Sequence, residues 1–246
     1  PGEPDMHFKT SLPLTIVLFL LATLFARLGL WQLERKAEKE ELFALFESAP
    51  VMGLQEALAS SIPFTRVRAT GRLDPERHFL QDNRMLLGRP GVHVLTPFDF
   101  GDQEQVLVNR GWLPMSADRR TLPAVQTDSA QRELSGRMVP LASTGPRLGE
   151  ADRLSPDDWP QLVTYLDRQP AAEALGTPLS SWIILLDKDQ PDGFEDRQWQ
   201  PAVMEPAVHG GYALQWFSLS AAAIIIWLIL GFRKGSSGRP GKPEID

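Results

Sequence analysis

The chain has 246 residues, of which 43% are hydrophobic and 23% are charged, and its formal net charge is -6 at pH 7. It contains no cysteine, which excludes disulfides, thiolate metal sites and cysteine nucleophiles. The acidic balance and the lack of a clustered basic stripe argue against a nucleic acid as partner. These averages are typical of a globular protein, but the apolar residues are concentrated near the two ends.

The first apolar segment, residues 12–31, predicts a transmembrane helix. A helix of this length rises about 30 Å, which is enough to cross a bilayer, and Arg27 is its one charged residue. The run is too long for a signal-peptide core, no A-x-A cleavage site follows it, and the helical pattern continues to about Glu47. We therefore favour an uncleaved anchor over a cleaved signal peptide, with residues 1–11 as a cytoplasmic N-terminus.

The second apolar segment, residues 209–232, contains no charged residue and predicts a second transmembrane helix. The orientation follows from the basic residues outside the spans, because cytoplasmic flanks are enriched in Lys and Arg. These residues are Lys9, Arg233, Lys234, Arg239 and Lys242. We expect a flexible cytoplasmic tail at 233–246 and an outer-face domain at 32–208. The lack of an Arg- and Ser-rich transit segment favours the bacterial inner membrane, with this domain in the periplasm.

Residues 32–208 predict one α+β domain. After Pro63 the pattern takes period two over TRVRATGRL, RHFLQDNRML, GVHVLTPFDF and EQVLVNRGWL, separated by turn-like residues, which predicts an antiparallel meander. Strand patterns return at RELSGRMV, LVTYLD and SWIILLDKD, and short helices are expected at GLQEALASS and PAAEALG. We predict a curved or partly barrel-like antiparallel sheet with a few helices, and long surface loops at 116–130 and 141–161.

The chain carries none of the common catalytic motifs. It has no Gly-rich phosphate loop, no G-x-S-x-G, no H-E-x-x-H and no EF-hand loop, so we do not expect an enzyme, although spacing alone does not exclude a spatial constellation. His78 and His93 could meet across a hairpin. Two imidazoles without a third ligand make a poor metal site, so core or solvent-facing histidines are the favoured interpretation.

His209 stands apart because it opens the second apolar segment. Gly210 and Gly211 follow it and leave space for a bulky flat group, and then come the aromatic residues Tyr212 and Trp216. From the residues alone, an interfacial aromatic belt with a solvated histidine is favoured. The alternative is a neutral imidazole that offers an axial ligand to haem iron. In that case Arg27 could reach the haem propionates, whereas otherwise it simply snorkels.

Three segments follow one another along the chain: LGLWQLERKAEK after the first span, GVHVLTPF with VLVNRGW in the domain, and HGGYALQWFSL at the second span. Their order and spacing resemble the surfeit locus protein 1 family of cytochrome c oxidase assembly factors, over nearly the whole chain. The resemblance implies a non-catalytic membrane protein that helps to place haem a in subunit I of the oxidase. It also implies that the histidine at the start of the second span, His209, ligates haem a.

The chain departs from the family at one point. Many members have a polar residue such as Asn before that histidine, whereas this chain has Ala207 and Val208, which puts polar support for the imidazole from that side in doubt. The candidate cofactor-binding residues are His209, Arg27, Tyr212 and Trp216.

Residues of the first two motifs are candidates for docking a partner, either oxidase subunit I or haem A synthase. They are Trp31, Gln32, Arg35, Asn109, Arg110, Gly111 and Trp112. For the middle motif a structural role is equally open, because Gly111 permits a tight bend and Trp112 covers the sheet.

We expect a transient haem chaperone in contact with membrane lipid and the oxidase. Two alternatives remain. One is a scaffold that binds subunit I or haem A synthase and never touches haem, and the other is an anchored outer-face sensor or binding domain unrelated to respiration.

Overall fold

The computed structural model describes residues 10–116, 121–141, 152–201 and 204–232. It divides into two compact units, Pro1–Ala44 with Ala202–Asp246, and Leu45–Pro201. Nearly all of the predicted N-terminal segment 1–11, the predicted tail 233–246 and half of the predicted loop 141–161 lie outside the described residues.

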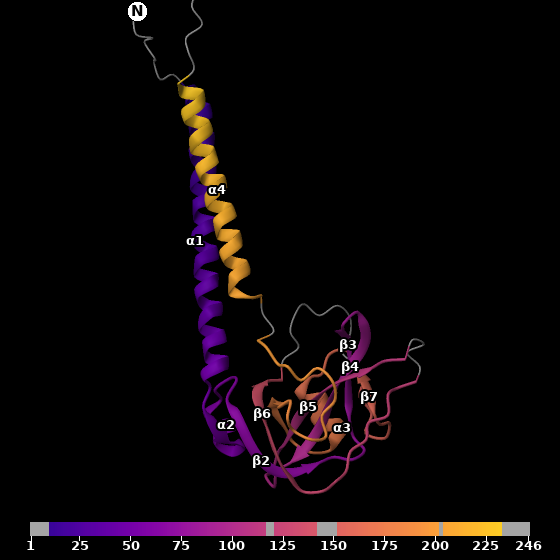
Figure 1. Cartoon of the computed structure of the whole chain (residues 1–246). Coiled ribbons are helices and arrows are strands. Elements are labelled where there is room, and N and C mark those ends of the chain that lie inside the picture. The colour runs from indigo at the N-terminus through magenta and orange to yellow at the C-terminus, as the bar shows by residue number, and fades with distance from the viewer. Residues whose placement is uncertain (1–9, 117–120, 142–151, 202–203, 233–246) are drawn as a thin grey trace, which may run out of the picture. The chain divides into compact units, whose positions relative to one another are not determined.

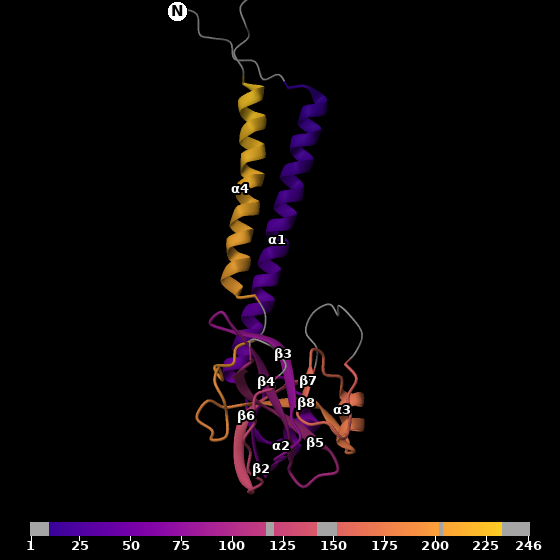
Figure 2. The same cartoon turned by 90° about the vertical axis from the view of Figure 1, so that its right-hand side faces the viewer.

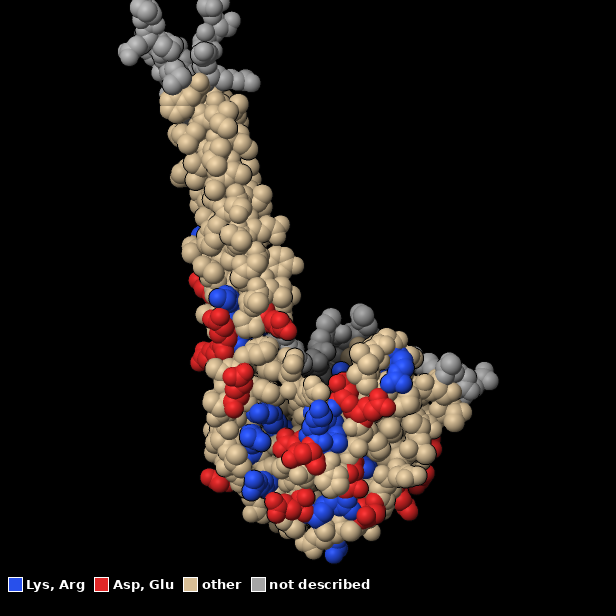
Figure 3. Space-filling view, viewed as in Figure 1, with Lys and Arg blue, Asp and Glu red and all other residues tan. Residues whose placement is uncertain are grey.

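The first unit contains two long helices, α1 (Leu12–Ser48) and α4 (Pro206–Gly231) (Figure 1). The last four residues of α1 belong to the second unit. Both helices are long and apolar enough to cross a membrane, and their visible surface is uncharged over most of its length (Figure 3). The continuation of α1 to Ser48 agrees with the predicted end near Glu47. Helix α4 begins at Pro206, a residue suited to a first helical position, so His209 lies within its first turn.

The two helices lie side by side (Figure 2), and small residues are at their contact. The hydroxyl of Ser220 donates a hydrogen bond to the backbone oxygen of Ala22 over 2.8 Å. At Gly29 an added Cβ would lie 2.7 Å from the ring of Phe217, so a larger residue would require this ring to shift. Such close contacts between small residues are typical of helix pairs in membranes. Segments nearly 200 residues apart in sequence are thereby brought together.

The second unit holds the strands and two short helices of the described chain. In chain order these are β1 (Val51–Gly53), α2 (Leu54–Ser60), β2 (Arg66–Leu73), β3 (Phe79–Leu86), β4 (Arg89–Asp99), β5 (Gln105–Pro114), β6 (Arg132–Pro140), β7 (Gln161–Val163), α3 (Arg168–Leu175) and β8 (Leu179–Leu186). Both predicted short helices are present, as are the predicted strand segments, except that LVTYLD is a strand only at Leu162 and Val163. In β2 exposed and buried residues alternate along the whole strand, as period two requires.

The strands form a closed barrel. They are hydrogen-bonded in the order β1-β2-β6-β8-β5-β4-β3-β7, and β2 also pairs with β4, so β2, β6, β8, β5 and β4 close a ring. This five-stranded arrangement is of the Greek-key kind found in OB-folds. The predicted antiparallel sheet needs one correction, because β5 and β8 pair in parallel, as do β1 with β2 and β3 with β7. Parallel strands are joined by long connections rather than tight turns, so no local turn motif predicts their pairing.

Strand β5 is buried on both faces. Val106 and Val108 belong to an apolar cluster with β2, β6, β8 and α2, whereas Leu107 belongs to a second cluster with β3 and α3. Successive side chains of a strand point to opposite faces, so β5 separates the two clusters. Everything on this strand from Val106 to Trp112 is therefore interior.

Candidate functional site

His209 of α4 faces Gln32 of α1. The Nδ1 atom of His209 lies 2.8 Å from the Oε1 atom of Gln32. An amide oxygen only accepts, so a hydrogen bond between these two atoms requires the imidazole proton on Nδ1, and in the neutral ring this leaves the lone pair on Nε2. That Nε2 atom is buried and has no hydrogen-bond partner among the described residues. A neutral imidazole nitrogen with a free lone pair is the form of histidine that binds metals.

The glycines beside His209 leave open space. A Cβ added at Gly211 would meet no described atom within 4 Å, and one at Gly210 would come no closer than 3.6 Å, to the side chain of Lys36. Helix packing therefore does not require glycine at either position, in contrast to Gly29. The structure leaves room for a Cβ at both positions, and space for a bulky flat group stays a prediction.

The other candidate cofactor residues are arranged less closely. Trp216 stacks on Phe25 with ring centroids 5.7 Å apart, and Tyr212 is 45% exposed. Arg27 is exposed and stands two residues from Phe25, so helical geometry directs its side chain away from α4. The structure therefore does not bring Arg27 to His209.

The first-motif residues divide into accessible and enclosed ones. Trp31 is 46% exposed, and the guanidinium of Arg35 lies 5.8 Å from the centroid of its ring and 2.6 Å from a carboxylate oxygen of Glu38. Both remain accessible for the predicted docking. Gln32 is only 9% exposed and its amide oxygen is engaged by His209. From the sequence, Gln32 was grouped with the docking residues and its contact with His209 was not predicted. A polar side chain in an apolar helix could have indicated a hydrogen bond to a neighbouring helix.

The middle-motif residues lie on β5 and are enclosed. Asn109, Arg110 and Trp112 are 4%, 1% and 0% exposed, and the indole N–H of Trp112 donates to a backbone oxygen in β3 over 2.9 Å. Gly111 has φ +104, and a Cβ there would lie 2.5 Å from the backbone oxygen of Glu195. This burial supports the structural interpretation of the motif. Direct docking by these side chains would require them to leave the interior.

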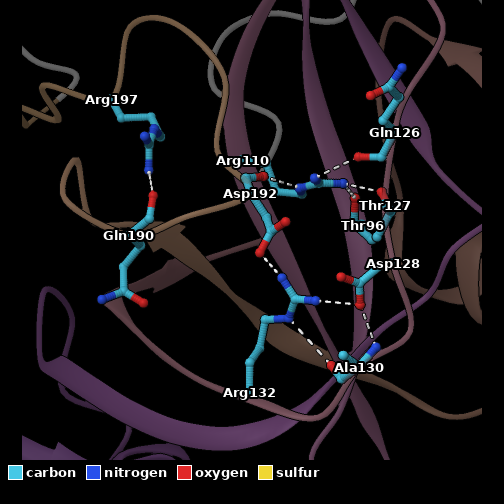
Figure 4. A network of polar contacts seen from close by, with 10 residues as sticks. All are labelled: Thr96, Arg110, Gln126, Thr127, Asp128, Ala130, Arg132, Gln190, Asp192 and Arg197. Atoms are coloured by element: carbon cyan, nitrogen blue, oxygen red, sulfur yellow. Dashed lines mark hydrogen bonds and ion pairs between the residues drawn. The ribbon is translucent and has the colours of Figure 1, made fainter.

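The guanidinium of Arg110 is the centre of a polar network that the sequence did not reveal (Figure 4). Its Nε donates to the backbone oxygen of Asp192 over 2.6 Å, Nη2 donates to that of Gln126 over 3.0 Å, and Nη1 donates to the hydroxyl of Thr127. Burial lowers the pKa of Arg110 to about 10, with the nearby cations Arg132 and Arg197 adding to the effect, so the group stays charged at neutral pH. Arg110 thereby ties two irregular segments to β5.

The two barrel histidines, His78 and His93, contact neighbouring side chains of the barrel unit. His78 is 2% exposed and its Nδ1 lies 3.0 Å from the hydroxyl of Thr96, while His93 stands edge-on to Trp199. Burial lowers the pKa of each to about 4. Gln81, not His78, is opposite His93 in the β3–β4 pairing, so the two do not face each other across the hairpin. The part of the chain that the structure describes contains no group of three or more potential metal ligands.

The family profile and the similar proteins found by sequence comparison agree with one another. The profile of the SURF1 family matches residues 19–221. A SURF1-like protein of Rickettsia felis is 27% identical over 222 residues, which are 87% of this chain and 95% of the relative. SURF1-like proteins of Drosophila melanogaster and Monosiga brevicollis are 29% and 28% identical, over 92% and 85% of this chain and 80% and 84% of theirs.

Proposed function

Because the chain belongs to the SURF1 family, we propose that it is a membrane-anchored assembly factor that binds haem a transiently and assists its insertion into subunit I of a haem–copper oxidase. The family is generally linked to cytochrome oxidase assembly, and its members are assembly proteins rather than enzymes. The proposed partners are oxidase subunit I, membrane lipid and haem A synthase.

The observation that carries the proposal is the free Nε2 atom of His209. A buried acceptor without a partner costs about 1–3 kcal/mol, and a bound metal would remove this cost. Histidine nitrogen is a common axial ligand of haem iron. Since Nε2 is covered, neighbouring side chains must shift to admit the iron, which limits affinity and favours release of the cargo. Tyr212 and Trp216 follow on the same helix and are proposed to line the macrocycle, whereas snorkelling explains Arg27 better.

The test is the optical spectrum of the detergent-purified full-length protein made in cells that synthesise haem A. We expect a haem a band in the wild type and its loss in His209→Ala. The matched control is His93→Gln, which alters a histidine of the barrel and should keep the band. Equal haem content in wild type and His209→Ala would remove His209 as the ligand.

The proposed location is the bacterial inner membrane, with residues 32–208 in the periplasm and both termini cytoplasmic. The support is the distribution of basic residues outside the two apolar helices. Because the chain has no cysteine, Leu87→Cys, at a position that is 92% exposed, gives a single reporter. It should react with an impermeant maleimide in intact spheroplasts. Labelling only after lysis would place the domain in the cytoplasm.

A scaffold that never touches haem is the second candidate, and the β3–β4 hairpin gives it a specific basis. At its tip Met85 and Leu87 are 63% and 92% exposed, and exposed apolar side chains of this kind can mark a docking site. If the scaffold is correct, changing both residues to serine should abolish co-purification with subunit I. Unchanged co-purification would exclude this surface.

A further inference from the structure

We propose that Gln32 is a positioning residue for His209: its amide oxygen holds the Nδ1–H group and thereby keeps the lone pair on Nε2. That the metal bound by Nε2 is haem iron rests on the proposed function. The tautomer of His209 does not depend on it. Nothing in the sequence pattern alone pairs these two residues, which are 177 positions apart.

The contact between Gln32 and His209 is short and its glutamine is nearly buried, as expected of a specific hydrogen bond. The two atoms are 2.8 Å apart, and the side chain of Gln32 is nearly enclosed. A neutral imidazole free in water carries its proton mainly on Nε2. In the protein the acceptor lies at Nδ1, and the hydrogen bond made by one ring nitrogen decides which nitrogen is protonated. Gln32 therefore reverses the ordinary preference and prepares Nε2 as a ligand before any metal arrives.

The position of Gln32 also explains how the imidazole can be supported although apolar residues, Ala207 and Val208, precede His209. Neither of these side chains can accept a hydrogen bond, so the support for the imidazole comes from the other helix instead. A ligating histidine that donates its second N–H becomes more basic, and loss of such a partner typically weakens metal binding about 10- to 100-fold. A neutral amide polarises the ring less than a carboxylate would, which suits a carrier that must release its cargo.

A plain role as polar glue between helices is the competing explanation. Glue requires only that Gln32 and His209 attract each other, whereas positioning requires that Gln32 decide the tautomer. The two explanations therefore differ in a property of the ring that can be measured without haem.

The first experiment uses the full-length protein in detergent, without haem and with ¹⁵N-labelled histidine. The His209 signals are assigned by their loss in His209→Ala. We expect Nδ1 to be protonated in the wild type and in Gln32→Glu, and Nε2 to be protonated in Gln32→Leu. The matched control is Gln215→Leu, an exposed glutamine of α4, which should leave the tautomer unchanged. The same tautomer in wild type and Gln32→Leu, with the helix pair intact by circular dichroism, would overturn the inference.

The second experiment uses the protein loaded with haem a and measures the iron–histidine stretching frequency by resonance Raman. Gln32→Glu should raise it and Gln32→Leu should lower it, with about 10- to 100-fold weaker haem binding in Gln32→Leu. Weaker binding with an unmoved frequency in both variants would mean that Gln32 is only structural. If the wild type binds no haem, the proposed function fails while the tautomer measurement still decides the role of Gln32.

Discussion

The guanidinium of Arg110 is held by oxygens from two irregular segments that follow β5 in the chain. Replacing it with lysine keeps the charge but loses the planar fork of donors, so the oxygens of Gln126, Thr127 and Asp192 cannot all be satisfied. We expect Arg110→Lys to lower the free energy of unfolding by about 1–3 kcal/mol. Urea denaturation followed by near-UV circular dichroism measures this loss.

The matched control for that change is Arg72→Lys, on an exposed position of β2. It should alter the free energy of unfolding by less than about 0.5 kcal/mol. Equal effects of the two substitutions would show that the Arg110 network contributes nothing specific.

His78 makes the stability of the barrel depend on pH. Burial lowers its pKa from 6.5 to about 4, so between these values the unfolded chain binds a proton that the folded chain does not. The stability is therefore complete above pH 6.5 and falls as the pH drops toward 4. At roughly 1.4 kcal/mol per pKa unit the loss reaches about 3 kcal/mol.

The measurement is the difference in urea midpoint between pH 7 and pH 5 for wild type and His78→Gln. The variant cannot take up the proton and should lose less stability on acidification. His93, whose pKa burial also lowers to about 4, should contribute in the same direction, so His78→Gln/His93→Gln should have the flattest profile. A wild-type slope in His78→Gln would refute the assignment.

At the residue scale the sequence was informative about His209 and not about its partner. A histidine at the start of an apolar helix is visible in the chain, but the register of two helices separated by more than 150 residues is not encoded in any local period. Asn109 and Arg110 were docking candidates because they belong to the middle motif of the family resemblance, for which a structural role was equally open. The burial of Arg110 became possible because distant loops supply hydrogen-bond acceptors, whereas Asn109 accepts a hydrogen bond from the backbone N–H of Gly111 in the same strand.

At the scale of elements, the closeness of α1 and α4 depends on Gly29. A Cβ at Gly29 would lie 2.7 Å from the ring of Phe217, so Gly29→Val would force the ring to shift, and such overpacking costs about 1–3 kcal/mol. The chain lacks cysteine, so Ala22→Cys with Ser220→Cys provides a background-free crosslink across the contact. We expect the disulfide yield to fall sharply when Gly29→Val is added.

Gly211→Val is the control for this helix pair. It makes the same chemical change in a helix where an added Cβ meets no described atom. The crosslink should then form as in the parent. Comparable losses in both variants would mean that valine perturbs the helices by itself and that close approach at Gly29 is unimportant.

Elements with a strong local period were predicted well. The two apolar helices, both short helices and the alternating strand β2 follow from residues within one element. Closure of the barrel depends on pairings such as β5 with β8, which join strands that are far apart in the chain. Local periodicity predicts a strand but not its neighbour, so the sheet was expected to curve while its parallel pairs were not foreseen.

At the scale of the whole molecule, the division into two compact units predicts that unfolding is not a single transition. Unfolding of the barrel unit exposes its buried core to solvent. Urea favours states with more exposed surface, so it should unfold this unit. The helices α1 and α4 in a micelle satisfy their backbone hydrogen bonds internally, and losing them would leave unpaired amides in an apolar medium. We expect urea to abolish the near-UV signal of the barrel while most of the helical far-UV signal persists. Arg110→Lys should lower the midpoint of the near-UV transition and Gly29→Val should leave it in place, whereas coincident loss of both signals would show that the two units unfold as one.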